Sequence, residues 1–169
     1  MKSFIHPTAI IYPNVFISDD CYIGPYCVIG APPEHGSVDP FTNEGAGVFI
    51  GTGSRLYGHV TVDSGIDRPT RIAHDCILMK HSHVGHDSTI HHNVTIACGA
   101  KIGGHSLVES YSNIGLNAVL HQFTDLPEGT MVGACAFVKG KYTEPWMILV
   151  GVPAGGLGRN KVGMERWKK

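Results

Sequence analysis

Histidine is the residue type in this sequence with the clearest capacity for chemistry. The chain has 11 histidines among its 169 residues, and most of them lie between positions 59 and 121. In the segment HSHVGHD, His86 stands directly before Asp87. A carboxylate beside an imidazole favours the protonated ring and holds one tautomer, which suits the ring to take a proton from an attacking hydroxyl or amine. The pair predicts His86 as a general base and Asp87 as the acid that orients it.

A stretch of backbone without side chains follows this pair, at Gly103 and Gly104. If one coil of the structure spans 18 residues, Gly104 lies beside His86 at the usual strand spacing of about 4.8 Å, and His105 lies beside Asp87. A bare peptide N–H in that place could stabilise a developing oxyanion. A base, an orienting acid and an oxyanion donor are the groups that acyl transfer from a thioester requires.

A repeat of six residues determines what positions these groups. Aliphatic residues recur with this period from Ile5 to Ile29, from Ile50 to Val62, and without a break from Ile72 to Val138. Four residues after most of them stands a small residue, such as Cys76, Ser82 or Ala100. Helices repeat every 3.6 residues and strands every two, so a period of six requires short strands joined by tight turns. The pattern predicts a solenoid.

The interruptions of the repeat give the expected organisation of the chain. Residues 1–142 form the solenoid, with loop insertions near 30–49 and 63–71, and residues 143–169 form a C-terminal strand and a short basic helix. Hydrophobic residues make up 43% of the chain, which is enough for one core. The balance of 13 basic and 14 acidic residues gives no indication of nucleic-acid binding.

Cysteine usage and the apolar runs exclude further classes. The five cysteines form no CxxC pair, so neither a disulfide framework nor a zinc knuckle is expected. No apolar run approaches the ~20 residues that cross a bilayer, and the first residues, MKSFIHPTAIIYP, lack the apolar core of a signal peptide. We expect a cytoplasmic protein without membrane insertion.

The hexads resemble those of the hexapeptide-repeat proteins, which implies an all-β fold, a single-stranded left-handed parallel β-helix with three hexads to a coil. Within that group, the stretch from SRLYGHVTVDSG to IGLNAVLHQF is similar to the UDP-N-acetylglucosamine acyltransferases. The resemblance implies His86 as general base, Asp87 as its orienting acid and Gly104 as oxyanion donor. It further implies that three more histidines bind substrate or line its cleft, namely His83, His105 and His121.

Three differences from that family bear on substrate and donor. Where the family has a histidine in a VTIHRG segment, this chain has Asp63 in VTVDSG, and we place Asp63 among the substrate-binding residues. The loop APPEHGSVDPFTNEGAG has no Lys or Arg where the family has a lysine. The ending GVPAG is similar to the GVPAK segment of CoA-dependent acetyltransferases, which implies donor binding by Gly151, Pro153, Ala154 and the following Arg159.

The resulting expectation is an acyltransferase. It moves an acyl group from coenzyme A or acyl carrier protein, as co-substrate, to a hydroxyl or amine of a sugar or nucleotide sugar, with no metal and no cofactor. By resemblance we expect a homotrimer whose three clefts lie between subunits. Two alternatives remain. One is a metalloenzyme like the γ-class carbonic anhydrases, with a metal bound by Asp63, His86 and His91. The other is an inert repeat scaffold, in which His86 is only a polar turn residue.

Overall fold

The computed structural model describes residues 2–41 and 45–167. Within these residues the strands form three sheets of nine, seven and six strands, called sheets A, B and C. Sheet A contains β1 (Phe4–Ile5), β4 (Tyr22–Ile23), β7 (Arg55–Leu56), β10 (Ile77–Leu78), β13 (Thr95–Ile96), β16 (Asn113–Ile114), β19 (Met131–Val132), β21 (Met147–Gly151) and β22 (Ala154–Arg159). Sheet B contains β2 (Ile10–Ile11), β5 (Val28–Ala31), β8 (Thr61–Asp63), β11 (His83–Val84), β14 (Lys101–Ile102), β17 (Val119–Leu120) and β20 (Phe137–Val138). Sheet C contains β3 (Val15–Ile17), β6 (Val48–Ile50), β9 (Thr70–Ile72), β12 (Thr89–Ile90), β15 (Leu107–Val108) and β18 (Asp125–Leu126).

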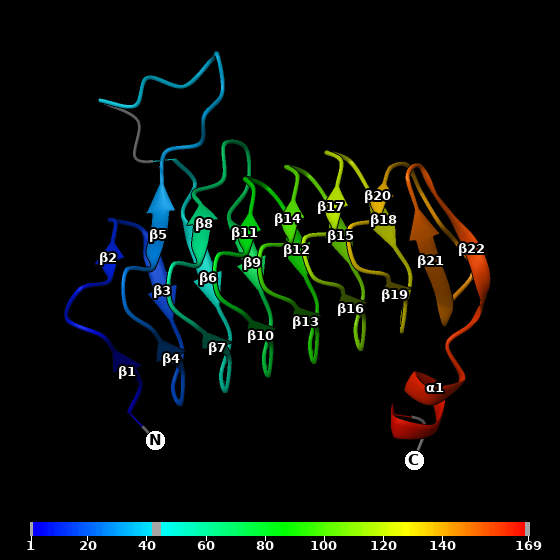
Figure 1. Cartoon of the computed structure of the whole chain (residues 1–169). Helices are drawn as coiled ribbons and strands as arrows, with labels where there is room; N and C mark the ends of the chain where they lie inside the picture. The colour runs from blue at the N-terminus through cyan, green and yellow to red at the C-terminus, as the bar shows by residue number, and fades with distance from the viewer. Residues whose placement is uncertain (1, 42–44, 168–169) are drawn as a thin grey trace.

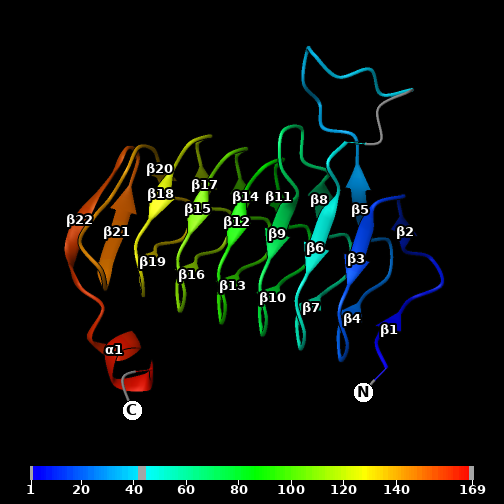
Figure 2. The ribbon, with the colours of Figure 1, turned by 180° about the vertical axis from the view of Figure 1, so that it is seen from behind.

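The sheets are the three faces of a prism that winds along one axis (Figures 1 and 2). Successive strands lie on successive faces. Where no insertion intervenes, parallel pairing joins residues that are 18 apart, as His83 with Lys101 and Val84 with Ile102. The register of 18 residues expected from the hexads is therefore confirmed. The fold is the predicted left-handed parallel β-helix.

The hexad residues point into the prism and form its core. Ile72, Leu78, Val84, Ile90 and Ile96 have no exposed surface, and the small residues between them, such as Ser82 and Ser88, are equally buried. The first hexad differs, because 44% of Ile5 is exposed. In the described part of the chain no coil packs on the outer side of β1. Ile5 therefore lies at the open end of the core and is only partly buried.

The corners of the prism are tight turns with one residue in the left-handed conformation. At the corner between sheets B and C, successive coils place Asp87, His105 and Phe123 there, with φ of 59°, 58° and 62°. Non-glycine residues seldom adopt this conformation, so the coil geometry imposes it. The repeat thus stacks three chemically different side chains in one line along the axis.

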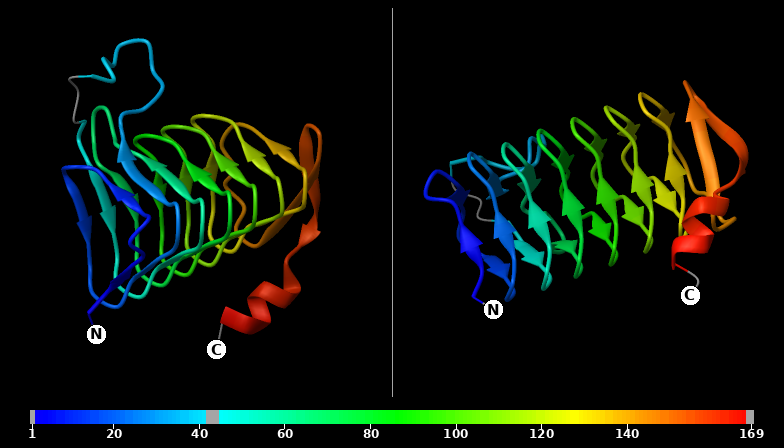
Figure 3. Two further views of the ribbon diagram at one scale, coloured as in Figure 1. Left: turned by 60° about the vertical axis from the view of Figure 1, so that its left-hand side comes forward. Right: turned by 60° about the horizontal axis from the view of Figure 1, so that its bottom comes forward.

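Two connections leave the prism. Residues 32–41 belong to the connection from β5 to β6 and extend away from the body of the prism, as Figure 1 and the left view of Figure 3 show. Residues 64–69 join β8 to β9 and stay close to the B–C corner. Both fall where the sequence breaks its period.

After the last coil, β21 continues sheet A beside β19, and β22 pairs back antiparallel to β21. The helix α1 (Lys161–Trp167) follows, with no buried residue. No helix in the described residues is long and apolar enough to cross a membrane.

Candidate active site

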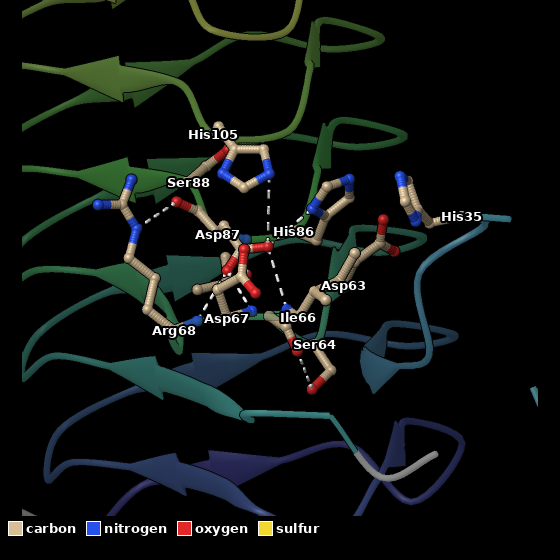
Figure 4. Close-up of polar contacts among 12 residues, drawn as sticks. His35, Asp63, Ser64, Ile66, Asp67, Arg68, His86, Asp87, Ser88 and His105 are labelled. Carbon is tan, nitrogen blue, oxygen red and sulfur yellow. Dashed lines mark hydrogen bonds and ion pairs between the residues drawn. The ribbon is translucent and has the colours of Figure 1, made fainter. Parts of the chain in front are cut away.

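The centre of the candidate site is the contact between His86 and Asp87 at the B–C corner (Figure 4). His86 Nδ1 lies 2.8 Å from Asp87 Oδ2, which is a short charge-assisted hydrogen bond. The Asp87 carboxylate has no exposed surface, whereas 15% of the His86 side chain remains accessible. With Nδ1 directed at the carboxylate, Nε2 is the ring nitrogen left for a substrate.

The buried Asp87 carboxylate is held by the short connection between β8 and β9. The backbone N–H groups of Asp67 and Arg68 donate to Oδ1 at 2.9 and 2.8 Å, and that of Ile66 donates to Oδ2 at 3.0 Å. Burial by itself would raise the pKa of Asp87, but the hydrogen bonds from His86 and from these three amides outweigh it and lower the pKa. Asp87 is therefore an ionised, immobile acceptor for the imidazole.

The backbone of Asp87 is fixed as well. Its N–H donates to Thr70 Oγ1 at 3.0 Å, and its carbonyl accepts a hydrogen bond from Arg68 Nε at 3.1 Å. The insertion near residues 63–71, which the sequence identified only as a break in the repeat, thus encloses Asp87 from two sides. Ile66, Asp67 and Arg68 were not among the predicted site residues, because they act mainly through their backbones and no side-chain pattern reveals that.

Gly104 lies one coil beyond His86 and directly against its ring. A methyl group built on Gly104 would come within 2.7 Å of His86 Nε2, so the ring occupies the space that a side chain would need. The N–H of Gly104 makes no hydrogen bond to any residue of the described chain, whereas its carbonyl accepts one from Phe123. A peptide N–H without an acceptor among the described residues, on a residue packed against the imidazole, is a candidate donor to an oxyanion.

His105 completes the corner. Its backbone N–H donates to the His86 carbonyl at 2.8 Å, and its Nε2 lies 3.9 Å from Asp87 Oδ2. The ring packs edge-on to His86, with centroids 5.0 Å apart, and is stacked on Phe123 at 4.7 Å. The structure therefore brings together His86, Asp87, Gly104 and His105.

A cavity of about 590 Å³ opens on the sheet B side of this corner. Asp63 and His83 line it, and their nearest atoms, Oδ2 and Nε2, are 3.6 Å apart. His83 Nδ1 lies 2.8 Å from Thr61 Oγ1. Burial raises the pKa of Asp63 to about 7, with His86 lowering it and Glu34 raising it further. Burial also lowers the pKa of His83, which favours a neutral ring.

A second cavity, of about 480 Å³, opens on the sheet C side. Asp87 and His105 separate it from the first, and its walls include Arg68, Leu107 and Phe123. The Arg68 guanidinium is oriented by its hydrogen bond to the Asp87 carbonyl. The His86–Asp87 corner thus has one cavity on the sheet B side and one on the sheet C side.

The remaining predicted residues lie apart from this centre. His121 follows β17 at the same corner, one coil beyond Gly103, and its Nδ1 lies 3.1 Å from the carbonyl oxygen of Gln122. Gly151, Pro153 and Ala154 form the turn between β21 and β22 on sheet A, and Arg159 lies 3.8 Å from Glu144. A single chain therefore does not bring the GVPAG segment to His86.

His35 was also not predicted, although it stands beside the base. It belongs to the connection between β5 and β6, and its ring centroid is 5.8 Å from that of His86. The loop folds back over the rim of the sheet B cavity, to which it also contributes Pro32 and Glu34. His35 lies outside the six-residue repeat. The repeat therefore does not predict which residues His35 lies beside.

The potential metal ligands that cluster in the described residues are His86, Asp87 and His105, with ligand atoms within 4.8 Å of one another. Each Asp87 oxygen already accepts two hydrogen bonds, which fill the sites a metal would use. His91, the third member of the set proposed from spacing, follows β12 at another corner, where it lies 3.7 Å from Glu109. One chain therefore does not assemble Asp63, His86 and His91 around a single point.

Comparisons with known proteins agree with the geometry. The sequence model of the bacterial transferase hexapeptide family (six repeats) matches residues 69–104, which include His86 and Gly104. The acyl-[acyl-carrier-protein]--UDP-N-acetylglucosamine O-acyltransferase of Paracoccus denitrificans is 32% identical over 146 residues, covering 84% of this chain and 54% of that protein. The enzyme of the same name from Campylobacter concisus is 30% identical, covering 89% and 57%. The chain spans a little over half the length of these curated relatives.

A solved structure gives the same result. The UDP-N-acetylglucosamine O-acyltransferase of Moraxella catarrhalis superimposes with a TM-score of 0.76 over 96% of this chain and 77% of that one, at 25% identity. A second acyltransferase structure, from Bacteroides fragilis, shares the fold with a TM-score of 0.87 at 24% identity, covering 98% of this chain and 64% of that one. The similar proteins compared here are acyltransferases by name.

Proposed function

Because this hexapeptide-repeat chain resembles the UDP-N-acetylglucosamine O-acyltransferases, we propose that it transfers an acyl group from a thioester to a nucleotide sugar. The acyl donor is acyl-coenzyme A or an acyl carrier protein, and the acceptor presents a hydroxyl or an amine. The observation that carries the proposal is the His86–Asp87 hydrogen bond of 2.8 Å together with the side-chain-free Gly104 against His86 Nε2.

In the proposed reaction His86 is the general base. The acceptor oxygen or nitrogen attacks the thioester carbonyl carbon while His86 Nε2 takes its proton. The carbonyl electrons move onto oxygen, where the Gly104 N–H stabilises the negative charge. The intermediate then collapses, the carbon–sulfur bond breaks, and the protonated His86 returns its proton to the departing thiolate. Asp87 balances the charge on the imidazolium and keeps the tautomer with hydrogen on Nδ1.

The two cavities support a division of the substrates. The sheet B cavity, with Asp63, His83 and Thr61, offers polar groups for a sugar. The sheet C cavity offers apolar walls at Leu107 and Phe123 and two cations, Arg68 and Lys141, which suit an acyl chain and the phosphate of its carrier arm. By the family resemblance we further propose a trimer, whose neighbouring subunits cover both cavities and bring in His121 and the GVPAG segment.

The release of free thiol tests the proposed function. The protein is incubated with acyl-coenzyme A or acyl carrier protein thioesters of several lengths and with a panel of nucleotide sugars, and thiol appearance and product mass are measured. We expect acceptor-dependent thiol release that His86→Ala reduces by about a hundredfold or more. The absence of acceptor-dependent release with every donor, or a His86→Ala protein that turns over normally, would overturn the proposal and favour a scaffold.

A further inference from the structure

The cavity on the sheet B side is lined by two carboxylates, Asp63 and Glu34, and by one lysine, Lys101. Asp63 and Glu34 both line it, and neither forms an ion pair with Lys or Arg in the described residues. Lys101 reaches the cavity wall, but its ammonium group donates to the carbonyls of His81 and Gly99 at 2.5 and 3.1 Å. One lysine therefore stands against two carboxylates, and in the described residues it forms an ion pair with neither.

Asp63 stands next to the proposed base. In Figure 4 its carboxylate lies between the rings of His86 and His35. Its one ion pair is the long contact of 3.6 Å to His83, and no backbone N–H is seen to donate to it. Only 20% of the side chain is exposed, so water does little to solvate the carboxylate. A buried carboxylate in this state gains from binding a cation.

We propose that the acceptor is an amino sugar nucleotide, whose ammonium group binds at Asp63 and is acylated on nitrogen. This inference rests on the proposed function and narrows its acceptor class. The site has two proton acceptors, His86 and Asp63, and this explains why an amine suits it better than an alcohol. A hydroxyl loses one proton during acyl transfer, whereas an ammonium loses two, one before attack and one afterwards. His86 accepts one proton, and Asp63, whose carboxylate lies beside the His86 ring (Figure 4), is the second acceptor.

The proton and bond changes balance with these two residues. The ammonium R–NH₃⁺ transfers a proton to the Asp63 carboxylate and becomes R–NH₂. The nitrogen lone pair forms the bond to the thioester carbonyl carbon, and the second proton moves from nitrogen to His86 Nε2. The oxyanion collapses, the carbon–sulfur bond breaks, and the thiolate takes the proton from His86. The products are an amide and a thiol, and Asp63 then releases its proton to water.

The test compares acceptors that differ at a single atom. UDP-N-acetylglucosamine and analogues with one sugar hydroxyl replaced by an amino group are assayed with the same acyl thioester. The readouts are kcat/KM from thiol release and the survival of the product in mild alkali, which cleaves esters but not amides. We expect kcat/KM for the best amine to exceed that for the parent sugar by about tenfold or more.

Variants at the carboxylates test the assignment to Asp63. Asp63→Asn is expected to lower the amine-to-hydroxyl ratio by about tenfold, and Asp63→His, which installs the residue of the similar enzymes, should move the preference toward the hydroxyl. Glu34→Gln, at an exposed loop position, should lower the ratio less. Unfolding curves of each variant verify that the coil is intact.

The outcomes separate this inference from the proposed function. A wild-type ratio of one or less, or a preference for the amine that persists in Asp63→Asn, overturns the amine assignment while acyl transfer stands. No thiol release with either kind of sugar overturns the proposed function itself.

Discussion

Two His–Asp pairs in this molecule share one local geometry but differ in their surroundings. His74 and Asp75 occupy the corner between sheets C and A, and His86 and Asp87 occupy the corner between sheets B and C. In both pairs the aspartate adopts the left-handed conformation, with φ of 58° and 59°, and Nδ1 contacts Oδ2 at 3.0 and 2.8 Å. The exposed fractions differ greatly, at 55% and 58% for the first pair and 15% and 0% for the second.

The neighbouring residues explain this difference. The next coil stacks His92 on His74, with ring centroids 4.8 Å apart, whereas it presents Gly104 to His86. The short connection 64–69 covers Asp87 with three amides. A His–Asp dipeptide at a turn is thus a recurrent product of the repeat. The insertion and the glycine, rather than the dipeptide, distinguish the candidate base.

The largest expected effect separates the two histidines directly. His86→Ala should lower kcat by about a hundredfold or more, because it removes the proton acceptor. His74→Ala should leave kcat within about twofold, since that ring faces solvent and another histidine. Steady-state kinetics of both variants, with melting temperatures as a check on folding, test the comparison. Equal losses in the two variants would contradict it.

The aspartates should differ in stability as well as in activity. In Asp87→Asn an amide nitrogen replaces one oxygen that accepts two donors, so buried N–H groups lose their acceptor. We expect a loss of about 1–3 kcal/mol in the free energy of unfolding and a strong fall in kcat. Asp75→Asn, at a mostly exposed side chain, should change stability by less than about 0.5 kcal/mol. Chemical denaturation of both variants measures the difference, and an unaffected Asp87→Asn protein would refute the role of the insertion.

Gly104→Ala tests the space beneath the imidazole. The added methyl would lie 2.7 Å from His86 Nε2, so the ring or the peptide must shift by some tenths of an ångström. We expect kcat to fall by about tenfold, because the base and the proposed oxyanion donor lose their alignment. The melting temperature should change little, since Gly104 has no left-handed φ that an alanine would strain. Unchanged turnover would show that the alignment of the His86 ring does not depend on the space left by Gly104.

The last effect depends on pH and concerns Asp63. Burial raises the pKa of this carboxyl from 3.8 to about 7, so the folded state binds the proton more tightly than the unfolded state. Between these values stability falls as the pH rises, by up to about 1.4 kcal/mol per pH unit. Asp63→Asn removes this penalty, so its gain in melting temperature over wild type should grow from pH 5 to pH 8, reaching a few degrees. A gain that is constant with pH would argue against a buried carboxyl.

The sequence predicted the frame of the molecule more fully than the surroundings of the site. The hexad period specified the strands, the inward residues and the register of 18, and through that register it placed Gly104 beside His86. These relations follow from a repeat whose neighbours in space lie at a fixed separation in sequence.

In the insertions, neighbours in space are not separated by a fixed number of residues in the sequence. The amides of Ile66, Asp67 and Arg68 act through a backbone conformation that no residue type encodes, and His35 reaches His86 from an irregular loop. The sequence likewise gave no means to separate His74–Asp75 from His86–Asp87 by environment, because burial at a corner depends on which insertion lies over it. The repeat supplies His86, Asp87 and Gly104, whereas the support of the Asp87 carboxylate comes from a segment where the period fails.

The bonds around Asp87 also limit how this solenoid can be re-engineered. Coils without an insertion repeat the interface of the coil before them, so they are the units that can be duplicated or deleted. Residues 61–105 cannot be divided in this way, since the insertion after β8, the turn after β11 and the glycine after β14 share one hydrogen-bonded centre. The transferable module of this protein is therefore this block of more than two coils, and a graft of any single coil leaves the base without its support.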